Sequence, residues 1–166
     1  GAGNGEMMKV MLESFKKFPS FINSCNIFIY EKSPKLIKEQ KKNIKFKNLK
    51  WLISLKKLNK SPSIFLANEF FDAIPIKQFQ KSGNIWFEKF VHISNNKKAK
   101  FINKKINIKK IEKKIDFKVS DQQNFIEYSP LGLKYLNDIF KFIKKNNGGI
   151  LIVDYGYFDE KMQDTL

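Results

Sequence analysis

Side chains that could do chemistry follow an apolar run at residues 63–68. In "FLANEFFDAIP" this run ends in Asn68 and Glu69, and Asp72 comes three residues later. Carboxylates and an amide aimed off the end of an apolar strand could form one wall of an active site, where a carboxylate can accept a proton. In a purely structural reading, Asp72 only caps the bend before Pro75. The sequence leaves both readings of Asp72 open and favours Glu69 as the chemical residue.

Acidic residues end three other predicted strands. Glu31 follows "NIFIY", Glu127 lies near the end of "QNFIEYS", and Asp154 follows "GILIV". Ligands of open α/β sheets bind beyond the carboxyl ends of the strands. We therefore expect these three acids to share one ligand-binding edge with Asn68 and Glu69.

A glycine-rich turn, "GAGNG", opens the chain with Gly1, Ala2, Gly3 and Gly5. Such a turn before a helix lets backbone N–H groups approach a ligand closely. Glu31 could then accept hydrogen bonds from the two ribose hydroxyls of an adenosine-containing ligand. The acid comes about 30 residues after the first glycine, later than the roughly 20 typical of dinucleotide folds. The glycine spacing is GxGxG and not GxGxxG, which also disfavours NAD as the ligand. Of the adenosine-containing ligands considered, S-adenosylmethionine (SAM) remains.

The elements that must position these residues alternate between helix and strand. The patterns predict helices at 6–17, 33–44 and 130–147, and strands at 26–31, 49–54, 63–68 and 123–129. A buried strand is predicted after Gly148-Gly149. The Ser82-Gly83-Asn84 turn predicts a β-hairpin. Region 97–118 is either a helix or a strand with a turn. This order is typical of one α/β domain, a mostly parallel sheet with helices on both faces and a hairpin and Lys-rich insertion at about 76–118.

Composition narrows the class of protein. The chain of 166 residues is 42% hydrophobic and 14% aromatic, which suits one folded domain and excludes disorder. A single cysteine and a single histidine exclude an intrachain disulfide and a Cys/His zinc cluster, and we expect no metal. No apolar run reaches the roughly 20 residues that span a bilayer. We interpret Trp51 and Trp86 as packing residues, His92 as a surface residue and Tyr155 as a strand-end anchor.

The formal net charge of +16 has two explanations, AT-biased coding and a surface selected to bind polyanions. All 32 basic residues are lysine, whereas recognition of phosphates and bases favours arginine. We therefore expect no specific nucleic-acid partner. The Lys-rich block 97–118 is either a solvated face or a docking surface for an acidic partner protein.

Several segments together carry a family resemblance. They are "GAGNGEMM", "YEKSPKLIKEQ", "FLANEFFDAIPIKQF", "WFEKFV", "IEYSPLG" and "GGILIVDYGY". In this order the chain resembles the MidA-like family of class I SAM-dependent methyltransferases over almost its entire length. The resemblance implies a Rossmann-like fold of which this chain is an internal fragment, with the first strand absent. The family commonly has Gly-Pro-Gly where this chain has Gly1-Ala2-Gly3.

The resemblance also implies roles for individual residues. Gly1, Ala2, Gly3 and Gly5 would form the SAM loop, Glu31 would hold the ribose, and Asn68 would bind the cofactor. Glu69 and Asp72 would face the methyl acceptor. Mitochondrial members of the family are arginine methyltransferases needed for respiratory complex I assembly.

We therefore expect a SAM-dependent protein arginine methyltransferase with a protein substrate, in the bacterial cytoplasm or the mitochondrial matrix. The alternative is a non-catalytic assembly or chaperone-like factor that retains the fold and uses its hairpin to hold a partner.

Overall fold

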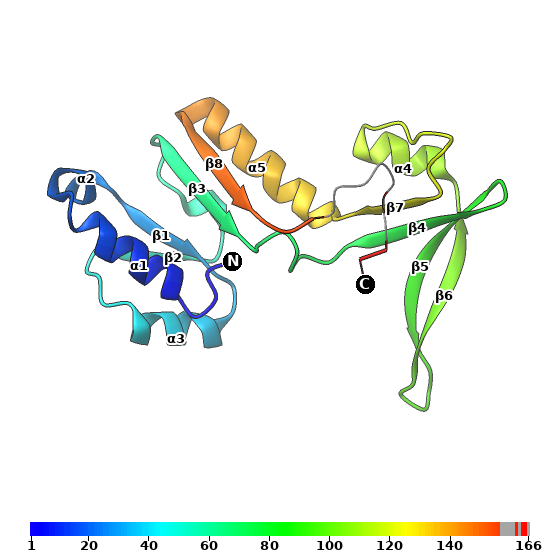
Figure 1. The fold of residues 1–166 in the computed structure, drawn as a ribbon, viewed down its shortest axis with the longest axis horizontal. Coiled ribbons are helices and arrows are strands. Elements are labelled where there is room, and N and C mark those ends of the chain that lie inside the picture. The colour runs from blue at the N-terminus through cyan, green and yellow to red at the C-terminus, as the bar shows by residue number, and fades with distance from the viewer. Residues whose placement is uncertain (157–161, 163, 166) are drawn as a thin grey trace. The chain divides into compact units, whose positions relative to one another are not determined.

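The structure, a computed structural model, describes residues 1–156, 162, 164 and 165. It divides into two compact units (Figure 1). Unit 1 comprises residues 1–73 and 136–155, and unit 2 comprises residues 74–135 with the described residues from 156 onward. The single domain with an insertion at about 76–118 stays a prediction.

Unit 1 begins with the predicted helices and strands in the predicted order, and one short helix at Pro19–Ser24, which was not predicted, follows the first helix. These are α1 (Glu6–Phe15), α2 (Pro19–Ser24), β1 (Ile27–Tyr30), α3 (Pro34–Asn43) and β2 (Leu49–Leu52). Strands β1 and β2 pair in parallel, with Tyr30 opposite Leu52 at their carboxyl ends. Helix α3 starts where the sequence indicates, because Ser33 Oγ accepts a hydrogen bond from the N–H of Leu36 at 3.3 Å and Pro34 occupies the first turn.

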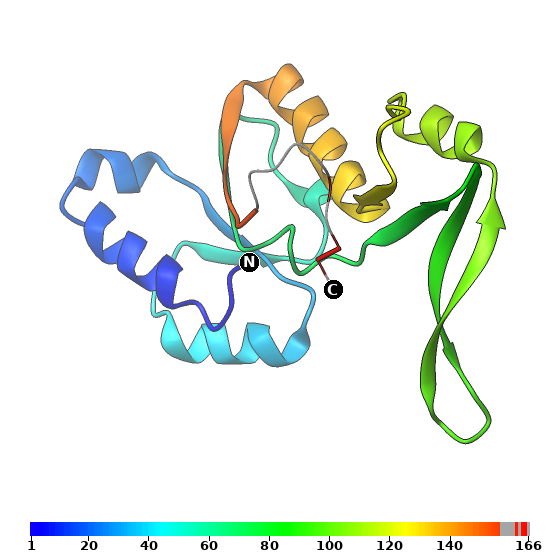
Figure 2. The same ribbon diagram turned by 45° about the vertical axis from the view of Figure 1, so that its right-hand side comes forward.

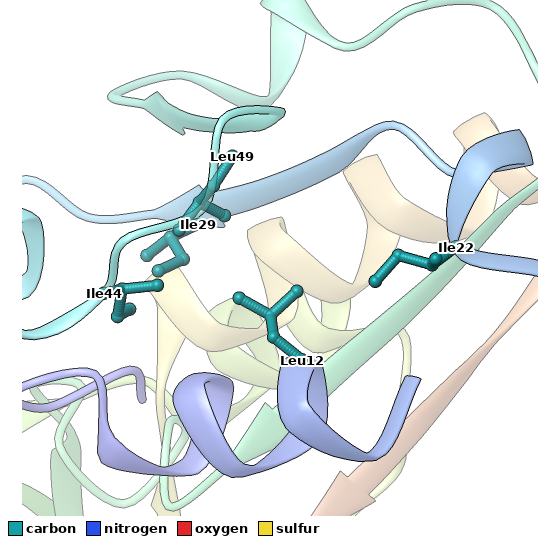
Figure 3. Packing of buried hydrophobic residues seen from close by; sticks show 5 residues of the cluster. All are labelled: Leu12, Ile22, Ile29, Ile44 and Leu49. Atoms are coloured by element: carbon teal, nitrogen blue, oxygen red, sulfur yellow. The ribbon is translucent and has the colours of Figure 1, made fainter. Parts of the chain in front are cut away.

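A buried cluster holds these elements together (Figure 3). Leu12 and Ile22 from the two helices meet Ile29 of β1, Leu49 of β2 and Ile44 directly after α3. Full burial of such a side chain contributes about 1.5–3 kcal/mol. The cluster therefore fixes α1 and the end of α3 relative to β1, and the candidate site lies at the carboxyl end of β1.

The second half of unit 1 is another parallel pair. After a short 3₁₀ turn, η1 (Leu55–Lys57), β3 (Ser63–Asn68) pairs with β8 (Gly148–Val153). Helix α5 (Pro130–Asn146) precedes β8, and the rings of Phe65 and Phe142 lie 5.6 Å apart in an edge-to-face contact. The chain leaves α5 through Asn147, in the left-handed region at φ 66°. The predicted stop at Gly148-Gly149 instead forms the first residues of β8.

The prediction that helices cover both faces of the sheet is not met for β3 and β8. Ile64 is 81% exposed, and Leu66, Leu151 and Val153 are also exposed. Side chains alternate between the two faces of a strand. Phe65 contacts α5, so its neighbours Ile64 and Leu66 point to the opposite face.

Unit 2 is built on a four-stranded antiparallel sheet. Its elements are β4 (Lys77–Ser82), β5 (Ile85–Ile93), β6 (Ala99–Ile106), α4 (Ile108–Ile115) and β7 (Phe125–Tyr128), and the strand order is β6-β5-β4-β7. The predicted hairpin turn is confirmed, with Gly83 at φ 57° between β4 and β5. The undecided region 97–118 contains both a strand and a helix. Phe79, Trp86 and Ile126 form the core of this unit.

The expected position of Glu127 is wrong. Its strand, β7, runs antiparallel to β4 in unit 2, so it does not end at the edge that β1, β3 and β8 provide. Glu127 Oε2 instead accepts a hydrogen bond of 2.7 Å from the buried side chain of Gln78. A short apolar run does not encode its direction, which depends on the strand it pairs with.

No helix among the described residues combines the length and apolarity that crossing a membrane requires.

Candidate cofactor and acceptor site

The glycine-rich turn leads directly into α1 and is closely packed on one side. Gly3 and Gly5 have φ values of +51° and +94°, and the Gly5 N–H donates to the Ala2 carbonyl at 2.9 Å. A Cβ atom at Gly5 would lie 2.7 Å from Ile44 Cδ1, whereas one at Gly3 would meet nothing within 4 Å. Glycine is therefore required at position 5 by close packing as well as by backbone conformation. Beside Gly3 the turn is open to a ligand.

A buried glutamine ties this turn to the rest of the site. Gln40 on α3 is 0% exposed. Its Nε2 donates to the Gly3 carbonyl at 2.7 Å and to Glu31 Oε2 at 3.3 Å, and its Oε1 accepts from Trp51 Nε1 at 2.8 Å. One side chain thus connects the turn, the acid after β1 and the indole on β2.

Sequence analysis missed Gln40, although a signal was present. Residues 37, 40 and 44 recur at helical spacing, and the first and last are isoleucines. A polar residue within an apolar helix stripe indicates a buried side chain that needs hydrogen-bond partners.

Glu31 lies at the carboxyl end of β1 with its carboxylate already oriented. Its backbone N–H donates to Leu52 O at 3.0 Å, and its Oε1 accepts from the N–H groups of Lys32 and Ser33 at 2.8 and 2.9 Å. The other oxygen, Oε2, receives the bond from Gln40. A carboxylate oxygen has two lone pairs, and the two N–H groups occupy both of those on Oε1. Oε2, with one bond from Gln40, is therefore the oxygen that can still accept a ligand hydroxyl.

The end of β3 adjoins the glycine-rich turn. Gly1 lies beside the end of β3, since a Cβ atom built on it would be 3.8 Å from Cδ2 of Phe70. The rings of Tyr30 and Phe70 lie 6.3 Å apart, which brings the carboxyl ends of β1 and β3 together. The turn, β1 and β3 therefore meet at one place in unit 1.

Glu69 has an unusual backbone. Its φ of +44° lies in the left-handed region, which is uncommon for residues other than glycine. The Glu69 N–H donates to Val153 O at 2.8 Å, which continues the β3–β8 pairing by one residue. Conformations of this kind cost about 1–3 kcal/mol and cluster at functional sites. The exposed Glu69 side chain is thus projected from the end of the strand.

Asp154 holds the bend that follows β3. Its Oδ2 accepts from the N–H groups of Phe71 and Asp72 at 3.1 and 3.3 Å, and its Oδ1 accepts from the N–H of Tyr155 at 3.1 Å. The acid that ends β8 therefore caps the bend. The carboxylate of Asp72 is hydrogen-bonded to the hydroxyl of Tyr155.

The electrostatics around Tyr155 are negative. The charge of Glu69 is the largest cause that raises the pKa of the Tyr155 phenol above 10.0. Desolvation, the hydrogen bond that the phenol donates to Asp72, and the charges of Asp72 and Asp154 also raise it. A chain with a net charge of +16 thus carries a local group of three carboxylates. A cation would be stabilised here.

Of the residues predicted for the site, Gly1, Asn68, Glu69 and Asp72 lie together at the end of β3, and Gly3 and Glu31 are joined through Gln40. Other expectations are confirmed. Trp51 packs against the cluster of unit 1, Trp86 is buried in unit 2, and His92 is exposed. Within the described residues, no group of three or more His, Cys, Asp or Glu side chains could hold a metal ion.

Two curated proteins similar to this chain are both named as protein arginine methyltransferases. The chain is 28% identical to "Protein arginine methyltransferase NDUFAF7 homolog, mitochondrial" of Caenorhabditis elegans over 95% of its own length and 42% of that protein. It is 26% identical to "Protein arginine methyltransferase NDUFAF7, mitochondrial" of Xenopus laevis, over 97% and 42% of the two chains. The chain thus spans about two fifths of the length of these relatives.

Solved structures share the fold. A protein of Burkholderia thailandensis crystallised with S-adenosyl-homocysteine matches with a TM-score of 0.63 at 17% identity, over 84% of this chain and 36% of that one. A native structure of an uncharacterized protein from the same organism matches with a TM-score of 0.64 at 17% identity, over 84% and 38%. These matches show an α/β fold similar to that of the two proteins.

A family model described as "Putative S-adenosyl-L-methionine-dependent methyltransferase" matches residues 1–166. The resemblance to MidA-like proteins is confirmed. The chain belongs to this family of methyltransferases, whose cofactor is SAM.

Proposed function

We propose that this chain supplies the cofactor-binding turn and the acceptor-facing wall of a methyltransferase that modifies arginine on a protein. The observation that carries the proposal is the group of Glu69, Asp72 and Asp154 around Tyr155, at the strand end that adjoins the glycine-rich turn.

The residues of unit 1 fit SAM. Gly3 leaves open space beside the turn, the first N–H groups of α1 follow it, and Glu31 offers an oriented carboxylate to a ribose. The side chain of Asn68 is available to the amino-acid end of the cofactor. When bound, SAM supplies a methyl group on a sulfonium, and the electrons of the broken S–C bond remain on sulfur. The turn and Glu31 position that methyl group, and positioning provides much of the rate acceleration in such a displacement.

Glu69 and Asp72 act on the acceptor. A guanidinium is a planar cation that two carboxylates can bind through its N–H groups. The nitrogen that gains the methyl group must lose one proton, and the carboxylate of Glu69 is the acceptor we assign. Asp72, held by Tyr155 on its side chain and by Asp154 on its backbone, orients the other edge of the guanidinium. The negative field at this site favours a cationic acceptor over a neutral one.

The relatives support the choice of arginine on a protein, because their names describe protein arginine methyltransferases. The same names carry the word mitochondrial, which supports a mitochondrial location for a eukaryotic source. A link to respiratory complex assembly and a bacterial cytoplasmic location stay predictions from the family resemblance.

The test uses the whole protein that carries this chain. Calorimetry should show binding of SAM and no binding of NAD. Transfer of labelled methyl from SAM to arginine-containing proteins should fall by about two orders of magnitude in Glu69→Gln, the size of effect typical of general-base loss. The matched variant Glu13→Gln removes one exposed carboxylate from α1 and should leave transfer unchanged. Failure to bind SAM would exclude the proposal. Binding with full transfer in Glu69→Gln would exclude the assignment of Glu69.

A further inference from the structure

Strands β5 and β6 of unit 2 form a β-hairpin, residues 85–106, whose ribbon is seen in Figure 2. This hairpin exposes three large apolar side chains on one face. Val91 pairs directly with Phe101, and Ile93 lies two residues further along the same face of β5. Their exposed fractions are 63%, 61% and 67% respectively. We call Val91, Ile93 and Phe101 the apolar patch. Contiguous apolar surface of this kind marks an interaction site more often than scattered single residues do.

The strand beside this patch is an edge strand. In the sheet order β6-β5-β4-β7, β6 pairs with β5 and, within the described residues, with no second strand. An edge strand presents N–H and C=O groups that can pair with an added strand. The hairpin therefore offers main-chain hydrogen bonds next to apolar side chains.

The charge of the hairpin determines which kind of binding partner its surface favours. Residues 85–106 contain six lysines and one acid, Glu88, which is ion-paired with Lys77. Lys89 Nζ lies 4.8 Å from the centroid of the Phe101 ring and is ion-paired with Asp164, whose Oδ2 is 2.8 Å away. The positive charge of the hairpin therefore comes mainly from its five other lysines, at positions 97, 98, 100, 104 and 105. Lysines on an edge strand oppose pairing with a second copy, because like charges would face each other. An occupant with negative charge is favoured instead.

We propose that the hairpin binds an extended acidic segment of a partner protein. The segment adds to β6 as a new edge strand, places alternate apolar side chains on the apolar patch, and directs its carboxylates toward the hairpin lysines. This surface uses none of the residues assigned to methyl transfer, so its test is independent of the proposed function.

The probe is a fluorescently labelled eight-residue peptide, the length of β6, in which glutamate alternates with valine. Fluorescence anisotropy with the whole protein should show saturable binding. A peptide with lysine in place of each glutamate should not bind, because only the charge has changed. Absence of binding by the acidic peptide would overturn the proposal.

Two protein variants locate the site. Val91→Thr combined with Phe101→Thr keeps residues suited to strands and removes apolar surface, and should weaken binding at least about tenfold. Lys100→Glu with Lys104→Glu should do the same, because both lysines lie on the face of β6 opposite Phe101, where the glutamates of the added strand would be. The matched pair Lys35→Glu with Lys38→Glu reverses two exposed charges on α3 and should change the affinity less than about twofold. Equal losses from both lysine pairs would show non-specific attraction and overturn the proposal.

Modified peptides test strand addition without changing the protein. Alternate N–H groups of an added strand point to its neighbour. Two peptides are therefore compared, one methylated on its odd-numbered backbone nitrogens and one on its even-numbered ones. The peptide whose methyl groups replace the N–H groups that face β6 should not bind, and the other should bind normally. Loss of binding by both methylated peptides, or by neither, would contradict strand addition. A short oligouridine and anionic vesicles complete the comparison, and hairpin-dependent binding of either one with no peptide binding would assign the surface to RNA or to membrane instead.

Discussion

The indole Nε1–H of Trp51 donates a 2.8 Å hydrogen bond to Oε1 of Gln40, the most completely buried polar side chain of unit 1. Through its other end Gln40 holds the Gly3 carbonyl and the carboxylate of Glu31. The position of the glycine-rich turn therefore depends on a side chain that is itself fully buried.

Replacement of Gln40 by leucine should weaken SAM binding about tenfold, equivalent to about 1.4 kcal/mol. It should also lower the free energy of unfolding by about 1–3 kcal/mol, because buried groups lose their partners. Calorimetry and denaturant unfolding measure the two effects. Gln78→Leu, which removes the other buried glutamine, should cost stability without changing the affinity for SAM. Equal affinities for wild type and Gln40→Leu would show that Gln40 only packs.

Substitution of Gly5 by alanine should destabilise the protein for two separable reasons. The φ of +94° is strained for any side chain, and the new Cβ would lie 2.7 Å from Ile44 Cδ1. Gly83→Ala provides the control, since Gly83 has φ +57° and open space around it, and should cost about 1–2 kcal/mol from strain alone.

The clash at Gly5 can be relieved separately. Ile44→Val removes Cδ1, so the double variant with Gly5→Ala should regain part of the lost stability. Thermal unfolding of the four proteins gives the interaction energy between the two sites. Additive losses would argue against the clash.

Removal of the Asp154 carboxylate should disorder the bend that carries Asp72. In Asp154→Ala the N–H groups of Phe71 and Asp72 lose their acceptor, which costs about 1.5–3 kcal/mol for hydrogen bonds to a charged group. We expect a lower kcat with little change in SAM affinity. Asp154→Asn retains an acceptor oxygen and should restore part of kcat, whereas Asp121→Ala should affect neither quantity. Unchanged kcat in Asp154→Ala would remove its positioning role.

Tyr155 should ionise at higher pH than an ordinary tyrosine. Its pKa is raised above 10.0, first by the charge of Glu69, so in the folded protein the phenol stays neutral beyond pH 10. As the pH rises past 10, the unfolded chain releases this proton first. The contribution of Tyr155 to stability is therefore complete below pH 10 and is lost as the pH rises through the folded-state pKa.

The difference in tyrosinate absorbance between wild type and Tyr155→Phe reports this titration. Glu69→Gln should lower the midpoint toward 10, because the main cause of the shift is removed. A midpoint that does not respond to Glu69→Gln would mean that the two side chains are not neighbours in solution.

The sequence by itself determined the local elements and the type of chemistry. Ser33 and Pro34 start α3, the Gly83 turn closes a hairpin, and residues 63–68 form β3 because these signals act over a few neighbouring residues. The family motifs predicted SAM as the cofactor. The acids at strand ends predicted that the segment containing Glu69 belongs to the candidate site.

Only the tertiary structure decided which of these residues meet. β7 has the same apolar pattern as the parallel strands, yet it pairs antiparallel with β4 and takes Glu127 away from the shared edge. The spacing of residues 37, 40 and 44 indicates that Gln40 is buried, but its bond to the Gly3 carbonyl forms only because α3 packs beside the glycine-rich turn. Asp154 caps a bend 82 residues earlier in the chain, through contacts that form when β8 pairs with β3. Local sequence patterns cannot predict such contacts, because strand partners and buried hydrogen bonds depend on long-range packing.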